Sequence, residues 1–193
     1  MKQLLIIFLL MFGILEKASA NYSKLVYDFE FNSIDGNKIK LSNFKDKVLV
    51  VVNAASRCGY TPQYEDLQKL WSNYKNKDLV VIGIPTNNFK QEPGNNKEIK
   101  DFCETNFGIN FPMAQKMDVI GRDAHPFYKW AKKNYGIGAI PKWNFHKILI
   151  NKQGNVEETF ASFTKPTSNK EIKNLFYLKA KKDSLIDFNA YYK

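Results

Sequence analysis

The two cysteines of this 193-residue chain are the residues whose chemistry is most conspicuous. Cys58 lies in the stretch NAASRCGYTPQY, Asn53 to Tyr64, which overlaps the end of the apolar run VLVVVNAA. A cysteine that only filled core space would lie inside that run. Cys58 lies instead where a buried strand is expected to end and a helix to begin, so we ask whether it is reactive.

The predicted position of Cys58 favours its thiolate. Backbone N–H groups and the dipole at a helix N-terminus stabilise negative charge, and Arg57 next door adds positive charge. The stretch C-G-Y-T has the spacing of a redox C-x-x-C, but Thr61 stands where the second cysteine would be. Any partner thiol must therefore come from Cys103 or from another molecule.

The first 20 residues differ from the rest of the chain. They read MKQLLIIFLLMFGILEKASA: a charged start, a short apolar stretch and an A-x-A ending. This pattern predicts a secretory signal peptide cleaved after Ala20, and the apolar run is too short for a comfortable membrane span. An uncleaved anchor is the alternative, because Glu16 and Lys17 precede the cleavage point. We expect an exported mature domain, 21–193, periplasmic in a bacterium or in the secretory pathway or an organelle of a eukaryote.

Two cysteines in an exported chain suggest a disulfide. As a permanent cross-link between Cys58 and Cys103, it would close a long loop and contribute roughly 3–4 kcal/mol on the loop-entropy model. As a reactive couple, the same pair would cycle between thiol and disulfide. The residue pattern by itself leaves both possibilities open.

The charge of the chain does not point to a nucleic-acid partner. The formal net charge is +10, but the lysines are scattered, with no basic run beyond the Lys179–Lys182 region. Weak attraction to anionic surfaces is the most that this distribution supports. We expect no nucleic-acid binding and no stable membrane insertion, and the overall composition is that of one globular domain.

The strands are predicted from apolar runs and turn residues. Two short alternating runs, 27–31 and 38–41, flank a turn and predict an opening β-hairpin. The runs 47–54 and 79–84 predict strands buried on both faces. A second hairpin is expected at 147–150 and 156–161.

The helices are predicted from caps and apolar spacing. Thr61 can cap a helix that has Pro62 in its first position. Further helices are expected from 94–96 to 108, from 125 to 134 and from 168 to 181. The order of elements predicts an α/β protein of thioredoxin-like fold, with a mixed central sheet flanked by helices and an N-terminal β-hairpin.

Four blocks of sequence occur together in a fixed order. They are NAASRCGYTPQY, IGIPTNNFKQEPG, DFCETNFGINFP and KWNFHKILI. With these blocks the chain resembles the glutathione peroxidase family from about 22 to 175. The resemblance implies that Cys58 is the peroxidatic cysteine and that Trp143 and Asn144 are polar groups around it. Asn88 stands where the family usually has a glutamine, and the chain is one residue shorter than the family pattern between Phe89 and Gln91.

The resemblance also assigns a role to Cys103. It matches the resolving cysteine of the branch that draws electrons from thioredoxin-like dithiol proteins. The short link between Trp130 and Trp143 supports this branch, because tetrameric members carry an insertion there, so we expect a monomer. We expect no cofactor.

The implied reaction is reduction of hydrogen peroxide and of organic or lipid hydroperoxides. The Cys58 thiolate would become a sulfenic acid, Cys103 would condense with it to a disulfide, and a dithiol partner would reduce that bond. We also expect the helix of Cys103 to open locally, because asparagine and glycine residues surround it. Two alternatives stay open: a non-enzymatic redox relay, with peroxide chemistry blunted by Asn88, and a peroxidase that uses glutathione.

Both histidines have simple structural interpretations. We expect His125, before Pro126, to start a helix and His146 to be a surface residue of a strand. Neither has a partner at metal-ligand spacing. The C-terminal extension 177–193 receives no role.

Overall fold

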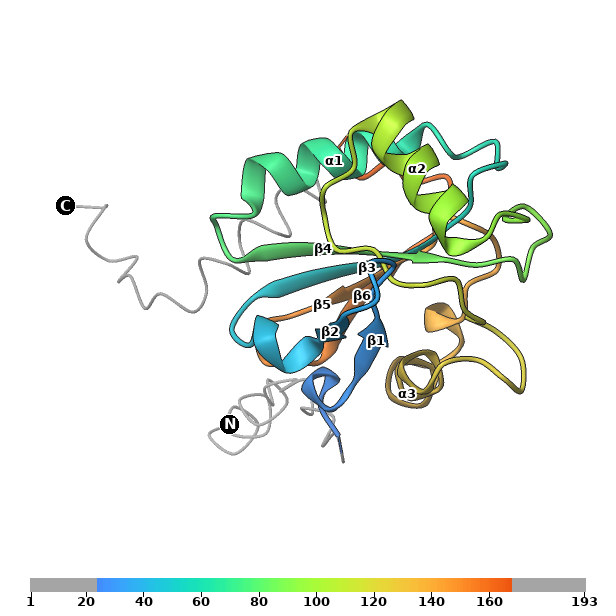
Figure 1. Cartoon of the computed structure of the whole chain (residues 1–193). Coiled ribbons are helices and arrows are strands. Elements are labelled where there is room, and N and C mark those ends of the chain that lie inside the picture. Colours follow the sequence, from blue (N-terminus) through green and yellow to red (C-terminus); the bar gives the residue numbers. More distant parts are fainter. Residues whose placement is uncertain (1–23, 168–193) are drawn as a thin grey trace, which may run out of the picture.

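The computed structural model describes residues 24–167 (Figure 1). Three predicted segments therefore lie outside the described residues: the signal peptide at 1–20, the helix at 168–181 and the extension at 177–193. In the described part, no helix combines the length and apolarity that crossing a bilayer requires.

The centre of the molecule is a four-stranded mixed sheet in the order β4-β3-β5-β6. β3 (Val48–Ala54) runs parallel to β4 (Leu79–Pro85), while β5 (Lys147–Ile150) pairs antiparallel with β3 and with β6 (Val156–Phe160). β3 and β4 are buried along their whole length, as their continuous β-branched runs predict. The predicted mixed sheet is confirmed.

Helices cover both faces of this sheet (Figure 1). α1 (Gln63–Tyr74) and α2 (Asn96–Phe107) lie over one face, and α3 (Pro126–Tyr135) lies over the other. The alternation of side chains along β3 divides the core accordingly. One buried cluster, which includes Val50, packs with α1 and α2, and the other, which includes Val51, packs with α3.

The predicted N-terminal hairpin is also confirmed. β1 (Glu30–Asn32) pairs antiparallel with β2 (Lys38–Lys40), and Phe31 opposes Ile39. Gly36 allows the turn, because its φ of +90° is one that glycine adopts readily. The hairpin belongs to the cluster on the α3 face.

α1 begins differently from the prediction. The helix begins at Gln63, and the Thr61 side chain does not cap it. The Thr61 hydroxyl accepts a hydrogen bond from the Cys58 N–H at 3.0 Å and donates one to the Ala55 carbonyl at 2.9 Å. The prediction of a capping Thr61 is wrong because this hydroxyl closes the preceding turn.

α2 is capped at both ends. The Asn95 side chain accepts a hydrogen bond from the Glu98 N–H, and the Glu98 carboxylate accepts one from the Asn95 N–H. Gly108 ends the helix in the left-handed region, at φ +60°. The polar residues that suggested a weak helix are therefore in part the caps that stabilise its ends.

The two histidines have different outcomes. His125 caps α3, its Nδ1 accepting a hydrogen bond from the Phe127 N–H, as predicted. His146 is buried beside β5, so its prediction as a surface residue is wrong. Its burial, together with the charge of Lys147, lowers the pKa of His146 to about 4. His146 is buried because it directly precedes β5, a strand whose residues are buried on both faces of the sheet.

Candidate active site

Cys58 lies in the turn between β3 and α1 and is almost completely buried. Its Sγ accepts a hydrogen bond from the Tyr60 N–H at 3.4 Å. Its own N–H is held by Thr61, and the Thr61 hydroxyl is anchored on Ala55 at the end of the strand. The turn therefore fixes the sulfur and directs a backbone donor at it.

Trp143 and Asn144 form a turn directly before β5. This turn is attached to β3 through Asn53, whose side-chain Nδ2 donates to the Trp143 carbonyl at 3.1 Å. The Phe145 N–H donates to the Asn53 carbonyl at 2.6 Å, and Phe145 has a left-handed φ of +63°. β3 thus positions Trp143 and Asn144 through Asn53, which lies five positions before Cys58 on the same segment.

Gln91 joins the two halves of the site. The fully buried Asn144 donates from Nδ2 to the Gln91 Oε1 at 2.9 Å, and the Gln91 carbonyl accepts from the Arg57 N–H at 3.1 Å. The Oδ1 of Asn144 is buried and has no hydrogen-bond partner among residues 24–167. Gln91 was not among the predicted site residues, and its contacts make it the amide that accompanies Asn144.

Asn88 is engaged elsewhere. Its Nδ2 donates to Asp118 at 2.7 Å, and its Oδ1 accepts from the N–H groups of Val119 and Ile120 and from the Thr86 hydroxyl. Both ends of the amide therefore fix the 118–120 loop. Within the described residues, none of its hydrogen bonds joins it to another predicted site residue.

Trp143 is the exposed member of the site, with 42% of its surface accessible. Its ring lies against Phe89, with 5.4 Å between the ring centroids. The indole is therefore held by an aromatic contact while part of it stays open to solvent. Two exposed or half-exposed aromatic rings give this side of the site an apolar approach for a substrate.

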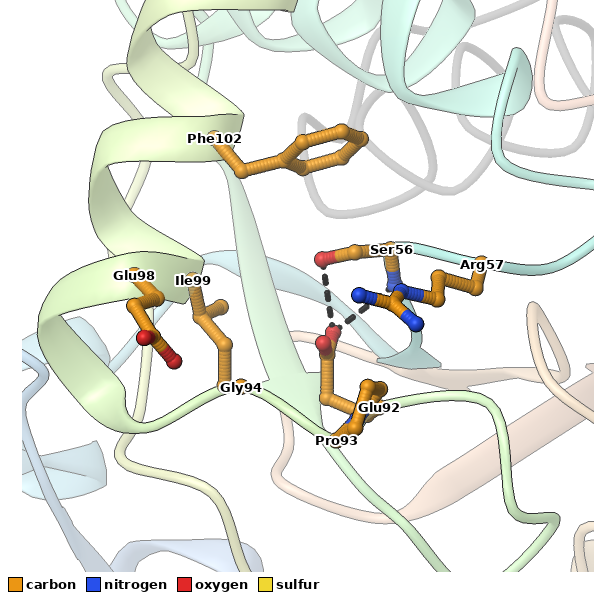
Figure 2. Close-up of a pocket in the computed structure, with 8 residues that line it drawn as sticks. All are labelled: Ser56, Arg57, Glu92, Pro93, Gly94, Glu98, Ile99 and Phe102. Carbon is orange, nitrogen blue, oxygen red and sulfur yellow. Dashed lines mark hydrogen bonds between the residues drawn. The ribbon is translucent and has the colours of Figure 1, made fainter.

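The side chain of Glu92 is bonded to the segment that precedes Cys58. Its carboxylate accepts from the Ser56 N–H at 2.8 Å and from the Ser56 hydroxyl at 2.9 Å (Figure 2). Its burial raises the pKa of Glu92, and the two hydrogen bonds from Ser56 oppose that rise. The carboxylate thus holds the segment that leads from β3 to the cysteine.

A cavity of about 300 Å³ separates this segment from α2. Ser56 and Arg57 line one side of it, and Ile99 and Phe102 of α2 line the other (Figure 2). The cavity therefore lies between the residues that precede Cys58 and those that precede Cys103.

Cys103 faces inward from α2 and is almost fully buried. It shares a core cluster with Cys58, and both are free thiols. Burial raises the pKa of the Cys103 thiol to about 11, while the Tyr64 hydroxyl acts to lower it. Cys103 also lines a second cavity, of about 550 Å³, with Trp71 and Phe111.

No metal centre is present in the part of the chain that the structure describes. Nowhere in it do three or more histidine, cysteine or acidic side chains gather in a way that could hold a metal ion.

The mixed sheet with helices on both faces, and the turn of Cys58 between β3 and α1, have the arrangement of the thioredoxin-like fold. The fold is similar to that of a thiol:disulfide interchange protein from Chlorobium tepidum, with a TM-score of 0.59 at 17% identity over 79% of this chain and 92% of the other. At that identity the likeness concerns the fold alone. The predicted thioredoxin-like fold is confirmed.

Sequence comparison defines the family. The glutathione peroxidase family model matches residues 26–132. The chain is 41% identical to the hydroperoxy fatty acid reductase gpx1 of Synechocystis, over 77% of this chain and 93% of that protein. It is 44% identical to the glutathione peroxidase-like peroxiredoxin gpx1 of Schizosaccharomyces pombe, over 72% and 90%.

A solved structure agrees. The crystal structure of Trgpx in its apo form has a TM-score of 0.65 and 35% identity, over 82% of this chain and 97% of the other. The chain therefore belongs to the glutathione peroxidase family. The predicted family is confirmed.

Proposed function

We propose that this protein is a thiol peroxidase that reduces hydrogen peroxide and organic or lipid hydroperoxides. The observation that carries the proposal is the buried Cys58 sulfur with the Tyr60 N–H directed at it. Gln91 is bonded to the Arg57 backbone and to the Asn144 side chain, so it links two amide groups to the segment that carries the cysteine. The printed names of the two relatives, a hydroperoxy fatty acid reductase and a peroxiredoxin, support the same reaction class.

The first step oxidises Cys58. Its thiolate attacks one peroxide oxygen, an S–O bond forms and the O–O bond breaks. The cysteine becomes a sulfenic acid, and the other oxygen leaves and takes a proton to become water or an alcohol. The Trp143 indole N–H and the amides of Asn144 and Gln91 are the donors proposed to orient the peroxide and stabilise the developing charge.

The second step uses Cys103. Its sulfur attacks the sulfenic sulfur, an S–S bond forms and the S–O bond breaks, and the oxygen leaves as water. A dithiol protein of the thioredoxin kind then reduces the disulfide by exchange. We propose this donor because Cys103 lies in the same core cluster as Cys58, which allows an internal disulfide to form after a local rearrangement.

Asn88 has a different proposed role. Because both ends of its amide are used by the 118–120 loop, we assign it to positioning that loop and assign the reacting amides to Gln91 and Asn144. We further propose an exported, monomeric protein with a signal peptide at 1–20, on the basis of the sequence pattern alone.

The test of the peroxidase is stopped-flow tryptophan fluorescence of the reduced protein mixed with hydrogen peroxide, with mass spectrometry of the products. Wild type should oxidise rapidly and end as a Cys58–Cys103 disulfide, and Cys103→Ser should oxidise equally fast and end as a sulfenic acid. Cys58→Ser is the control and should not react. Oxidation of wild type no faster than that of a free thiol would overturn the peroxidase and leave the two cysteines as a structural cross-link or a redox relay.

The donor is tested separately on the oxidised protein. Reduction is followed with thioredoxin, thioredoxin reductase and NADPH, and with glutathione, glutathione reductase and NADPH. We expect steady turnover with thioredoxin and slow turnover with glutathione. Faster turnover with glutathione would overturn the assignment of the donor and leave the peroxidase step standing.

A further inference from the structure

Tyr64 connects the peroxide site to the helix of the second cysteine. It lies in the first turn of α1 and is fully buried. Its ring makes an edge contact with Phe145, at 5.2 Å between centroids, and a tilted contact with Phe107, at 5.4 Å. Phe145 follows Asn144, and Phe107 is the last residue of α2. Tyr64 therefore packs against the turn that carries Asn144 and against the helix that carries Cys103.

The hydroxyl of Tyr64 has no hydrogen-bond partner of good geometry among residues 24–167. A buried hydroxyl without a partner is costly and calls for an explanation. Burial raises the pKa of Tyr64 well above its ordinary value, and Cys103 adds most to this effect, ahead of Glu92 and Cys58. The hydroxyl therefore keeps its proton and can donate it in a hydrogen bond.

Cys103 needs such a donor. It must react as a thiolate, and burial holds the pKa of its thiol at about 11. Glu92 and Glu104 act in the same unfavourable direction, and Tyr64 is the group that acts to lower the pKa. The Tyr64 hydroxyl, unpartnered within residues 24–167, thus belongs to the same buried cluster as Cys103, and the Tyr64 ring contacts Phe107, which lies one turn beyond Cys103 in α2.

We propose that the Tyr64 hydroxyl donates a hydrogen bond to the Cys103 thiolate and so assists its attack on the sulfenic acid of Cys58. The hydroxyl stays unpaired while Cys103 is a thiol, because a thiol sulfur is a weak acceptor. In the step, the proton of Cys103 neutralises the hydroxide that leaves Cys58, so water is released and no external reductant is needed. This inference rests on the proposed function, since it concerns the second step of that reaction.

Tyr64→Phe removes only the hydroxyl and leaves the ring contacts in place. In single turnovers with one equivalent of hydrogen peroxide, quenched by alkylation and analysed by mass spectrometry, sulfenic acid formation should keep its wild-type rate. Disulfide formation should slow about tenfold, which corresponds to one hydrogen bond to a charged group. The midpoint of its pH profile should also move to higher pH.

Tyr128→Phe is the matched control. Tyr128 is also a buried tyrosine whose hydroxyl has no partner in the described chain, but it lies in α3, in the core cluster on the opposite face of the sheet. This variant should leave both phases and both pH profiles unchanged. An equal slowing in the two variants would mean that loss of a buried hydroxyl acts through stability alone and would overturn the proposal.

An equilibrium measurement separates this proposal from the peroxidase itself. In Cys58→Ser, where Cys103 is the only thiol, the pH dependence of its alkylation reports its ionisation directly. Adding Tyr64→Phe should move that profile upward, whether or not the wild type is a peroxidase. If wild type forms the disulfide but the profile and the disulfide rate do not respond, the role of Tyr64 is overturned and the proposed function stands. If wild type forms no disulfide, the second step of the proposed function fails and the role of Tyr64 in that step fails with it, while the alkylation profile still reports whether Tyr64 stabilises the Cys103 thiolate.

Discussion

At the scale of single residues, the site is organised by amide groups that look alike in the sequence and do different things. Gln91 and Asn88 lie three positions apart in one loop. Gln91 bonds to the buried Asn144, while Asn88 bonds to Asp118 and to the backbone of the following loop. These different partners are the reason for assigning Gln91 to the proposed peroxide site and Asn88 to the 118–120 loop.

Gln91→Ala should lower the rate constant of Cys58 with hydrogen peroxide. The variant removes one amide from the site and leaves Asn144 without its partner, and loss of one such group typically costs about 10²-fold in rate. Stopped-flow fluorescence in Cys103→Ser measures this step alone. A wild-type rate in Gln91→Ala would remove Gln91 from the site.

Asn88→Ala is the matched comparison. It should leave the peroxide rate within about threefold of wild type and lower the free energy of unfolding by about 1–3 kcal/mol, because Asp118 and two backbone N–H groups lose their partner. Urea denaturation measures the stability. The reverse pattern, with stability retained and the peroxide rate lost, would restore Asn88 as the reacting amide.

A physical reason in the sequence singles out Cys58, which follows a buried strand and precedes a helix. Trp143 and Asn144 were assigned only because their block of sequence resembles the family, and their roles stay predictions. Gln91 was missed because its bond to Asn144 spans 53 positions. The signal that could have found Gln91 was an amide side chain directly before Glu92-Pro93-Gly94. Because the loop is one residue shorter than the family pattern, either Asn88 or Gln91 could take the place of the family's glutamine.

At the scale of elements, the fold was predictable where residues mark the ends. Continuous β-branched runs gave the buried strands, and Asn95 and Gly108 marked the ends of α2. The predictions for Thr61 and His146 were wrong because both depend on tertiary contacts. The Thr61 hydroxyl bonds to the Ala55 carbonyl of the preceding turn, and His146 is buried by the layers that cover the sheet. Local patterns do not contain such contacts.

The cap of α2 should control the second step of the reaction. Asn95→Ala removes the capping box, which costs about 1 kcal/mol, and so lets α2 open about fivefold more often. Water then reaches Cys103 and relieves the burial that opposes its thiolate. We expect faster amide exchange across Cys103 and disulfide formation up to about fivefold faster, with sulfenic acid formation unchanged.

Lys97→Ala is the control for this variant. Lys97 is an exposed residue of the same helix, paired with Asp101 four positions away, and its loss should cost a few tenths of a kcal/mol. Both the exchange rates and the disulfide rate should stay near wild type. Faster exchange in Asn95→Ala without faster disulfide formation would mean that the second step does not depend on opening of α2.

At the scale of the whole molecule, a buried lysine joins the end of the described chain to α1. The Lys147 ammonium donates to the Gln63 side chain at 2.5 Å and to the Thr164 carbonyl at 2.6 Å. The Gln63 Nε2 donates to the Ser162 carbonyl. The charge thus meets only neutral acceptors, and burial lowers the pKa of Lys147 to about 7, with Asp66 partly opposing the shift.

This lysine should give the protein a stability that rises with pH above neutrality. The ordinary pKa of 10.5 means that the unfolded chain keeps the proton up to that pH, whereas the folded chain releases it near pH 7. Between these values the unfolded state binds more protons, so raising the pH favours the folded state. One group contributes at most about 1.4 kcal/mol per pH unit.

Urea denaturation of the reduced protein between pH 7 and pH 8 measures the effect, below the range in which the Cys103 thiol, with its pKa raised from 9.0 to about 11, adds an opposite slope. Wild type should gain stability across this range, and Lys147→Met, which keeps the length of the chain without the charge, should lose most of that gain. Lys69→Met is the control, because Lys69 is an exposed lysine of α1, the helix that also carries Gln63. This variant should keep the wild-type slope. Equal slopes in wild type and Lys147→Met would mean that the ammonium keeps its proton in the folded state, and that its neutral acceptors are sufficient to hold a buried charge.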